Sequence, residues 1–118
     1  MLIPEVIAKS FSIENFENNI RSYKNILIGS GTSDISEKYI NVISNNLKHL
    51  NSIVIDAGAL KYLKKGYSYS NKVIITPHPG EAANLLNISS DEVQKDRYNA
   101  ARKLNQLFDC IIILKGSG

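Results

Sequence analysis

Four short apolar runs recur along the chain, and they constrain its fold more than any other feature. They are residues 26–28, 53–55, 73–75 and 110–114. Each run is continuously apolar rather than alternating, which is typical of strands that are covered on both faces. Helical patterns separate the runs. This order predicts an α/β fold with a parallel sheet, right-handed crossovers and helices on both faces.

The segments between the runs have the apolar spacing of amphipathic helices. Residues 35–50 place one apolar stripe on a helix face, residues 59–63 suggest a short helix, and residues 81–86 suggest a helical turn. A capping box at residues 89–92 predicts one long helix that continues to Phe108. The polar segment 66–71 is predicted to be a loop. A short strand near residues 2–7 and a helix near residues 13–20 are expected to come first.

Length and composition exclude several classes of protein. The 118 residues suit a single domain over residues 1–118, and the net charge of +3 is too small to indicate nucleic acid or a membrane as a partner. No apolar run approaches the roughly 20 residues of a membrane-spanning helix. The single cysteine, Cys110, cannot form an internal disulfide. A reduced, cytoplasmic setting is therefore expected.

Distinctive residues follow the end of every predicted strand. In parallel α/β sheets, ligands bind beyond the carboxyl ends of the strands, so these residues are expected to meet at one edge. They are Gly29-Ser30-Gly31, Asp56, Thr76-Pro77-His78-Pro79-Gly80-Glu81 and Lys115-Gly116-Ser117-Gly118.

Each of these segments has a functional and a structural interpretation. The glycine turn at residues 29–31 can approach a ligand closely or can be an ordinary strand-to-helix turn, and Asp34 replaces the third glycine of a dinucleotide-binding motif. Asp56 can accept a hydrogen bond from a ligand hydroxyl or from loop amides. The glycine-rich run after Lys115 can wrap a phosphate, or it can be a frayed chain end.

The histidine between two prolines is the most specific of these signals. Pro77 and Pro79 restrict the backbone around His78 and so place an imidazole at a strand end. The same residues also resemble a plain helix start. His49, near a helix end, is expected to be solvated. Two histidines and one cysteine, widely spaced, give no zinc pattern, and no G-x-S-x-G nucleophile motif is present.

Residues 73–86 resemble the signature of the ADP/ATP-dependent NAD(P)H-hydrate dehydratases, which are ribokinase-like repair enzymes. Other segments resemble that family in the same order: Ile3-Pro4-Glu5-Val6, the glycine turn, Asp56-Ala57-Gly58-Ala59-Leu60, and the run that ends in Lys115-Gly116-Ser117-Gly118. The resemblance covers nearly the whole chain and implies a ribokinase-like α/β fold.

The resemblance also implies a reaction. The family uses ATP or ADP to dehydrate the hydrated S form of NADH or NADPH, through phosphorylation of the ring hydroxyl and departure of phosphate. By position, Gly29, Gly31, Asp56 and His78 would lie on the nicotinamide side. Residues 115–118 would hold the phosphates of ADP or ATP, and Mg²⁺ is implied by phosphoryl transfer. No protein-held metal site is predicted. A homo-oligomer is expected by resemblance.

The sequence departs from the family in several places. The family's glycine turn usually reads G-P-G-L-G, whereas residues 29–33 read Gly-Ser-Gly-Thr-Ser, and Gly58 stands where a second Asp is common. The G-T-G-D segment with the expected catalytic Asp would follow Gly118, and a glycine- and alanine-rich segment would precede Ile3. The chain is therefore expected to be part of one domain, inactive alone and prone to associate. A nucleotide-binding remnant and a ribokinase-like small-molecule kinase are the alternatives.

Overall fold

The computed structural model describes residues 5–6, 12–29 and 37–116, with the backbone alone for residues 5–6. Its centre is a five-stranded sheet with the strand order β1-β2-β3-β4-β5, and every neighbouring pair is parallel. The strands are β1 (Glu5–Val6), β2 (Asn25–Ile28), β3 (Ser52–Ile55), β4 (Val73–Ile75) and β5 (Ile111–Ile112). The predicted parallel α/β sheet is confirmed, with β1 added to the four apolar runs.

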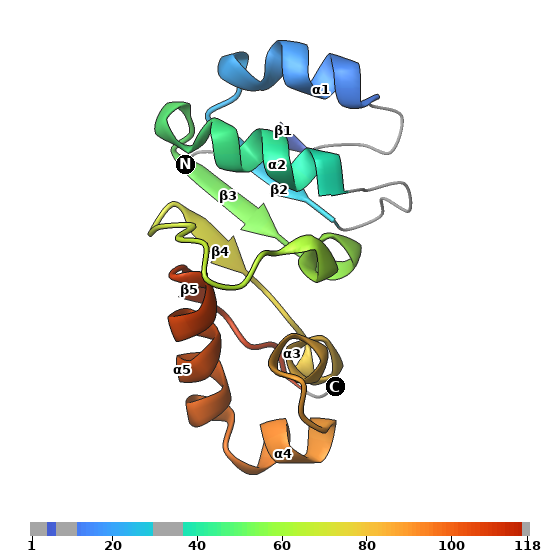
Figure 1. Cartoon of the computed structure of the whole chain (residues 1–118), viewed down its shortest axis with the longest axis vertical. Coiled ribbons are helices and arrows are strands. Elements are labelled where there is room, and N and C mark those ends of the chain that lie inside the picture. The colour runs from blue at the N-terminus through green and yellow to red at the C-terminus, as the bar shows by residue number, and fades with distance from the viewer. Residues whose placement is uncertain (1–4, 7–11, 30–36, 117–118) are drawn as a thin grey trace.

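Helices connect the strands (Figure 1). The α-helices are α1 (Ile13–Asn19), α2 (Glu37–Asn45), α3 (Pro79–Leu86), α4 (Ser90–Lys95) and α5 (Arg97–Phe108), and the 3₁₀ helices are η1 (Ile20–Ser22), η2 (Leu47–His49) and η3 (Ala57–Tyr62). The expected helix near residues 13–20 is therefore present. The described part of the stripe, residues 37–50, contains α2 and η2, and the expected short helix is η3.

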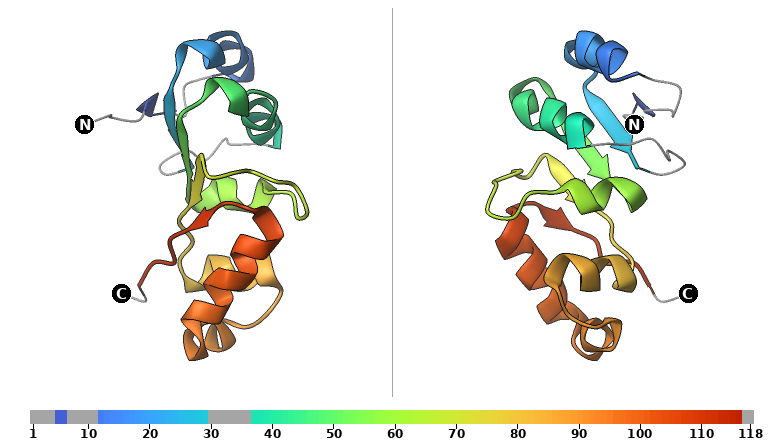
Figure 2. Two further views of the ribbon diagram at one scale, coloured as in Figure 1. Left: turned by 90° about the vertical axis from the view of Figure 1, so that its left-hand side faces the viewer. Right: turned by 45° about the vertical axis from the view of Figure 1, so that its right-hand side comes forward.

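The described helices all lie on one face of the sheet (Figure 2, left view). The prediction of helices on both faces is therefore wrong for the described part of the chain. The strand order supplies the reason. Each helical connection joins a strand to its immediate neighbour, and the order always advances from β1 toward β5. Because such crossovers between parallel strands are right-handed, all of them place their helices on the same face of the sheet. Covering the second face requires a reversal of the strand order, which these five strands do not contain.

Burial differs between the two faces of the strands. The residues that face the helices are almost fully buried, at 0–1% exposure: Ile26, Ile28, Ile53, Ile55, Val73 and Ile75. The residues between them form one row across the sheet, with Leu27 paired to Val54, Val54 to Ile74, and Ile74 to Ile111. We call Leu27, Val54, Ile74 and Ile111 the open-face row. The first three are half-buried, and Ile111 is 41% exposed.

Two predicted elements differ from those observed. The predicted single helix from the Ser89 capping box to Phe108 is two helices, because Asp96 leaves the helical conformation (φ −147°, ψ 80°). Its side chain then accepts a hydrogen bond from Asn99 N at 3.0 Å, which caps α5. The predicted strand at residues 110–114 is also shorter, since β5 ends at Ile112.

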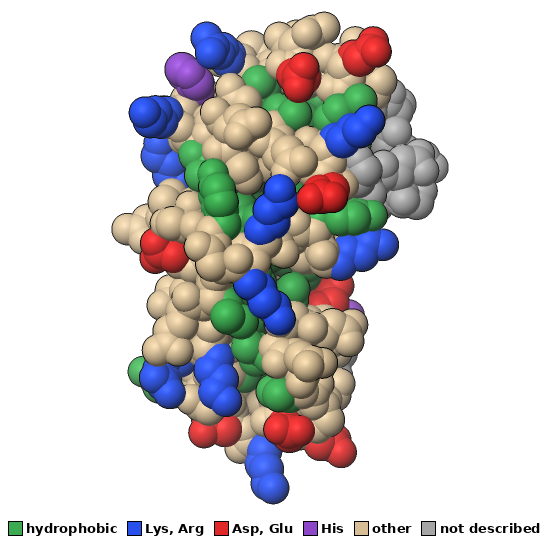
Figure 3. All heavy atoms as spheres, viewed as in Figure 1, with side chains coloured by type: hydrophobic (Ala, Val, Ile, Leu, Met, Phe, Trp, Pro, Cys, Tyr) green, Lys and Arg blue, Asp and Glu red, His purple; other side chains and the backbone are tan. Residues whose placement is uncertain are grey.

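No described helix is long and apolar enough to cross a bilayer. On the face shown in Figure 3, basic and acidic side chains are interspersed rather than gathered by sign. This pattern agrees with the small net charge of +3.

Candidate functional site

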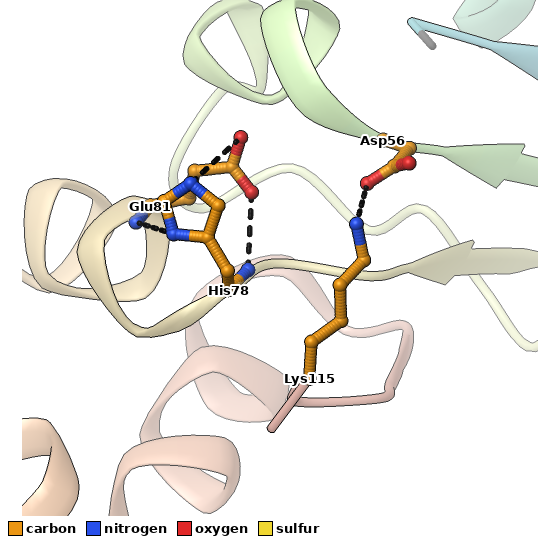
Figure 4. A network of polar contacts seen from close by, with 4 residues as sticks. All are labelled: Asp56, His78, Glu81 and Lys115. Atoms are coloured by element: carbon orange, nitrogen blue, oxygen red, sulfur yellow. Dashed lines mark hydrogen bonds and ion pairs between the residues drawn. The ribbon is translucent and has the colours of Figure 1, made fainter. Parts of the chain in front are cut away.

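The carboxyl ends of β2, β3, β4 and β5 meet at one edge of the sheet, as the sequence predicts for a parallel fold. Gly29, Asp56, His78, Lys115 and Gly116 lie at this edge. Gly31, Ser117 and Gly118 lie outside the described residues. The polar contacts around Asp56 and His78 are drawn in Figure 4.

Gly29 allows β2 to end against the backbone of Asp56. Its φ is +116°, and a Cβ at this position would lie 1.7 Å from Asp56 O. Asp56 N in turn donates a hydrogen bond to Ile28 O at 2.9 Å. A side chain at residue 29 would therefore clash with rigid backbone, so the first glycine of the turn places Asp56 within the site.

Asp56 is held in its ionised form by its neighbours. Its side chain is 17% exposed and accepts a hydrogen bond from Lys115 Nζ at 2.7 Å (Figure 4). Burial alone would raise the pKa of Asp56. Hydrogen bonds from Lys115, from the Thr76 side chain and from the Ala57 backbone outweigh burial, so the pKa lies below the ordinary 3.8. Asp56 was expected on the nicotinamide side and Lys115 on the phosphate side, so one ion pair joins the two sides of the predicted site.

His78 is the N-cap of α3, and its imidazole folds back over the first turn (Figure 4). His78 Nδ1 accepts from Glu81 N at 3.2 Å, and Glu81 Oε1 accepts from His78 N at 3.0 Å. Glu81 Oε2 lies 3.6 Å from His78 Nε2. Because Nδ1 is an acceptor, the neutral ring carries its proton on Nε2, on a side chain that is 55% exposed.

Gly80 and Glu81, which belong to the predicted strand-end segment but were not named as site residues, set the orientation of His78. A Cβ on Gly80 would lie 3.0 Å from His78 Cε1, so glycine leaves the space that the ring occupies. Glu81 completes the reciprocal cap. The signal was present in the sequence, since Glu stands three residues after the cap position.

A small cavity lies beside His78 and Glu81. Its volume is about 220 Å³, and it is lined by Ala57, Gly58, Leu60, Lys61, Glu81, Asn84 and Leu85. The lining comes from η3 and α3, which follow the Asp56 and His78 strand ends. A mostly apolar lining with a few polar side chains is typical of a small-molecule subsite.

The described residues contain no group of three or more His, Cys, Asp or Glu side chains that could hold a metal ion. Asp56, a carboxylate that contacts the start of the candidate phosphate loop, is paired with Lys115 at 2.7 Å. Mg²⁺ is usually bound through substrate phosphates and one or two carboxylates. The described residues therefore do not form a magnesium site of their own.

The sheet, its crossovers and the convergent strand ends define a parallel α/β protein with a ligand site at the carboxyl ends of its strands. A ribokinase-like protein from Enterococcus faecalis has a similar fold, with a TM-score of 0.63 at 24% identity over 90% of this chain and 39% of its own. The model of the NAD(P)H-hydrate dehydratase family matches residues 1–118. The chain belongs to the NAD(P)H-hydrate dehydratase family.

Individual relatives agree with this assignment. A bifunctional NAD(P)H-hydrate repair enzyme, Nnr, of Vibrio cholerae is 37% identical over 99% of this chain and 24% of its own length. The ADP/ATP-dependent NAD(P)H-hydrate dehydratase of Bacillus subtilis, co-crystallized with ATP and Mg²⁺, has a TM-score of 0.61 at 32% identity over 80% of this chain and 33% of its own. The chain thus spans about a quarter to a third of these two relatives.

Proposed function

We propose that this chain supplies part of the active site of an ADP/ATP-dependent dehydratase that repairs hydrated NADH or NADPH. The observation that carries the proposal is the meeting of Asp56, His78 and Lys115 at one sheet edge. Family membership and the B. subtilis enzyme co-crystallized with ATP and Mg²⁺ support the choice of reaction.

Residues at different positions along the sheet edge would bind different parts of the two substrates. Gly29, Gly31 and His78 would contact the hydrated nicotinamide nucleotide, with Asp56 on the same side. His78 is suited to this role because its side chain is 55% exposed and its Nδ1 is already occupied by Glu81 N, which leaves Nε2 as the ring nitrogen for a ligand. Lys115, Gly116, Ser117 and Gly118 would hold the phosphates, and Mg²⁺ would arrive bound to the nucleotide.

The reaction has two stages. The ring hydroxyl attacks the terminal phosphoryl group of ATP or ADP, and ADP or AMP leaves. The phosphate ester then leaves as inorganic phosphate with the electron pair of its C–O bond, helped by the ring nitrogen lone pair. Loss of a ring proton restores the double bond of NADH or NADPH. The base that starts the first stage is expected from a segment that follows Gly118 in the family, so we propose that these 118 residues alone bind nucleotide without turnover.

Calorimetry with ADP and ATP, beside an assay of hydrated NADH, tests this proposal. We expect binding of ADP and ATP that weakens in Lys115→Met and stays unchanged in His49→Ala, which replaces an exposed histidine on η2. His78→Ala should instead weaken binding of hydrated NADH. Dehydration by the 118-residue chain would overturn the proposed lack of turnover. Equal nucleotide affinity in wild type and Lys115→Met would overturn the phosphate role of residues 115–118.

Three further statements stay proposals. The chain is proposed to be part of a single larger domain, which accounts for a sheet with helices on one face. Association with another copy would cover the open-face row. A reduced, cytoplasmic setting agrees with Cys110, the single cysteine, whose thiol pKa is raised to about 12 by burial and by the nearby Asp109 charge.

A further inference from the structure

Arg97, which no part of the site above uses, reaches the chain where the candidate nucleotide loop begins. It is the first residue of α5 and is half-buried. Its Nη2 donates hydrogen bonds to Leu114 O at 3.2 Å and to Lys115 O at 2.7 Å. Its Nη1 donates to Gln94 Oε1 at 2.7 Å, which steadies the guanidinium from the other side.

This contact fixes the direction of two successive peptide groups. In a continuing strand, successive carbonyls point to opposite sides, whereas here both point toward Arg97. The described peptide bonds are all trans, so each N–H points away from the carbonyl of the same peptide. Lys115 N–H accordingly points away from Arg97 and donates to Pro77 O at 2.9 Å.

The same geometry turns Gly116 N–H to the side away from Arg97, where Pro77 and the His78 loop lie. Successive N–H groups on one side of the backbone are the basis of the concave anion sites found in phosphate-binding loops. Arg97 also turns two carbonyl oxygens away from that side. Carbonyl oxygens facing a phosphate would repel it.

We propose that Arg97 is a positioning residue for the phosphate-binding loop that begins at Lys115. It holds the backbone so that Gly116 N–H, rather than the carbonyl oxygens of Leu114 and Lys115, faces the phosphates of the nucleotide, while Lys115 N–H anchors the loop to Pro77 O. The inference rests on the proposed function of residues 115–118. Its first test needs no nucleotide, so the two can fail separately.

The first measurement is amide hydrogen exchange in the ligand-free chain. Arg97→Met removes the guanidinium and keeps much of the side-chain length. Arg102→Met is the matched control, because Arg102 lies on the same helix and, among the described residues, donates a hydrogen bond to Asn99 Oδ1 alone, at 2.9 Å. We expect exchange of Lys115 N–H to become roughly tenfold to a hundredfold faster in Arg97→Met, since hydrogen bonds to charged groups have about that effect. Arg102→Met should leave it unchanged.

Exchange of Ile53 N–H, which donates to Lys72 O at 2.8 Å in the centre of the sheet, reports whether each variant remains folded. If Arg97→Met does not fold, Arg97→Lys replaces it, because a single ammonium can reach one carbonyl but not hold both in a planar fork. Unchanged exchange of Lys115 N–H in whichever variant folds would overturn the inference.

The second measurement is ADP affinity by calorimetry. We expect Arg97→Met to bind ADP roughly tenfold to a hundredfold more weakly than Arg102→Met, and millimolar methylguanidinium to restore part of the affinity of Arg97→Ala. Full ADP affinity in Arg97→Met, despite fast exchange at Lys115, would overturn the positioning role. A wild-type chain that does not bind ADP would overturn the proposed function, while the exchange result would still decide whether Arg97 orders the loop.

Discussion

Gly29 shows how a single residue can decide whether the site forms. Replacement by alanine would bring a Cβ to 1.7 Å from Asp56 O, against backbone that cannot easily move. We expect Gly29→Ala to destabilise the chain by about 3 kcal/mol, the upper end of the usual cost of overpacking. Gly66→Ala is the control, because its φ is +81° but, its chain neighbours aside, no atom of the described residues lies within 4 Å of the added Cβ. That variant should lose only about 1 kcal/mol from backbone strain. Urea unfolding measures both, and equal losses would contradict the steric explanation.

The Asp56–Lys115 pair makes a prediction about pH. The folded-state pKa of Asp56 is lowered, so its contribution to stability is present above the ordinary pKa of 3.8 and is lost as pH falls through the lower, folded value. In Lys115→Met, burial should dominate and the pKa of Asp56 should rise. Carbon-13 NMR titration of the Asp56 carboxyl group measures this change. The loss of stability that Asp56 contributes on acidification should disappear in Lys115→Met, because a carboxyl group with a raised folded-state pKa binds its proton more readily in the folded chain than in the unfolded chain. An unchanged Asp56 pKa would contradict the role given to Lys115.

At the scale of elements, the break between α4 and α5 depends on Asp96. Asp96→Ala removes the side chain that accepts from Asn99 N at 3.0 Å and should cost about 1 kcal/mol of stability. Asp96→Asn should restore most of that loss, because asparagine caps helices nearly as well. Thermal unfolding with both variants checks the assignment. A full loss in Asp96→Asn would show that the charge, not the cap, matters.

The helices and strands could be predicted where apolar runs and turn residues nearby in the sequence indicate the same element. Prediction was less successful where contacts between distant residues determine the structure. The strands at residues 26–28, 53–55 and 73–75 were predicted from their apolar runs alone. Residues 79–81 also resemble a helix start in the sequence, but the capping role of His78 was not predicted. The break at Asp96 was missed because helical spacing continues through it. Tyr69, in a loop expected to be polar, is fully buried and its hydroxyl accepts from Lys64 N at 2.8 Å, a contact that composition does not predict. Arg97 was missed for the same reason, since its partners lie 17 and 18 residues away.

At the scale of the whole molecule, the predicted placement of helices on both faces of the sheet was wrong for the described residues. Continuously apolar strands indicate two covered faces, whereas the described helices cover one. The open-face row and the exposed Ile113 (52%) should therefore drive association. We expect analytical ultracentrifugation to show mass rising with concentration, and Ile113→Lys to reduce that rise. Gln106→Lys adds the same charge at an exposed position of α5 and should not. A monomer at every concentration would contradict this expectation.

The strand order also has a consequence for synthesis on the ribosome. Each strand after the first pairs with the strand made just before it, so every new strand–helix unit finds its docking edge already in place. No strand has to wait for a distant segment to emerge, and the loops that close on pairing stay short. The sheet can thus grow in the direction of translation, one unit at a time, with Lys115 reaching Asp56 only after all five strands have been made.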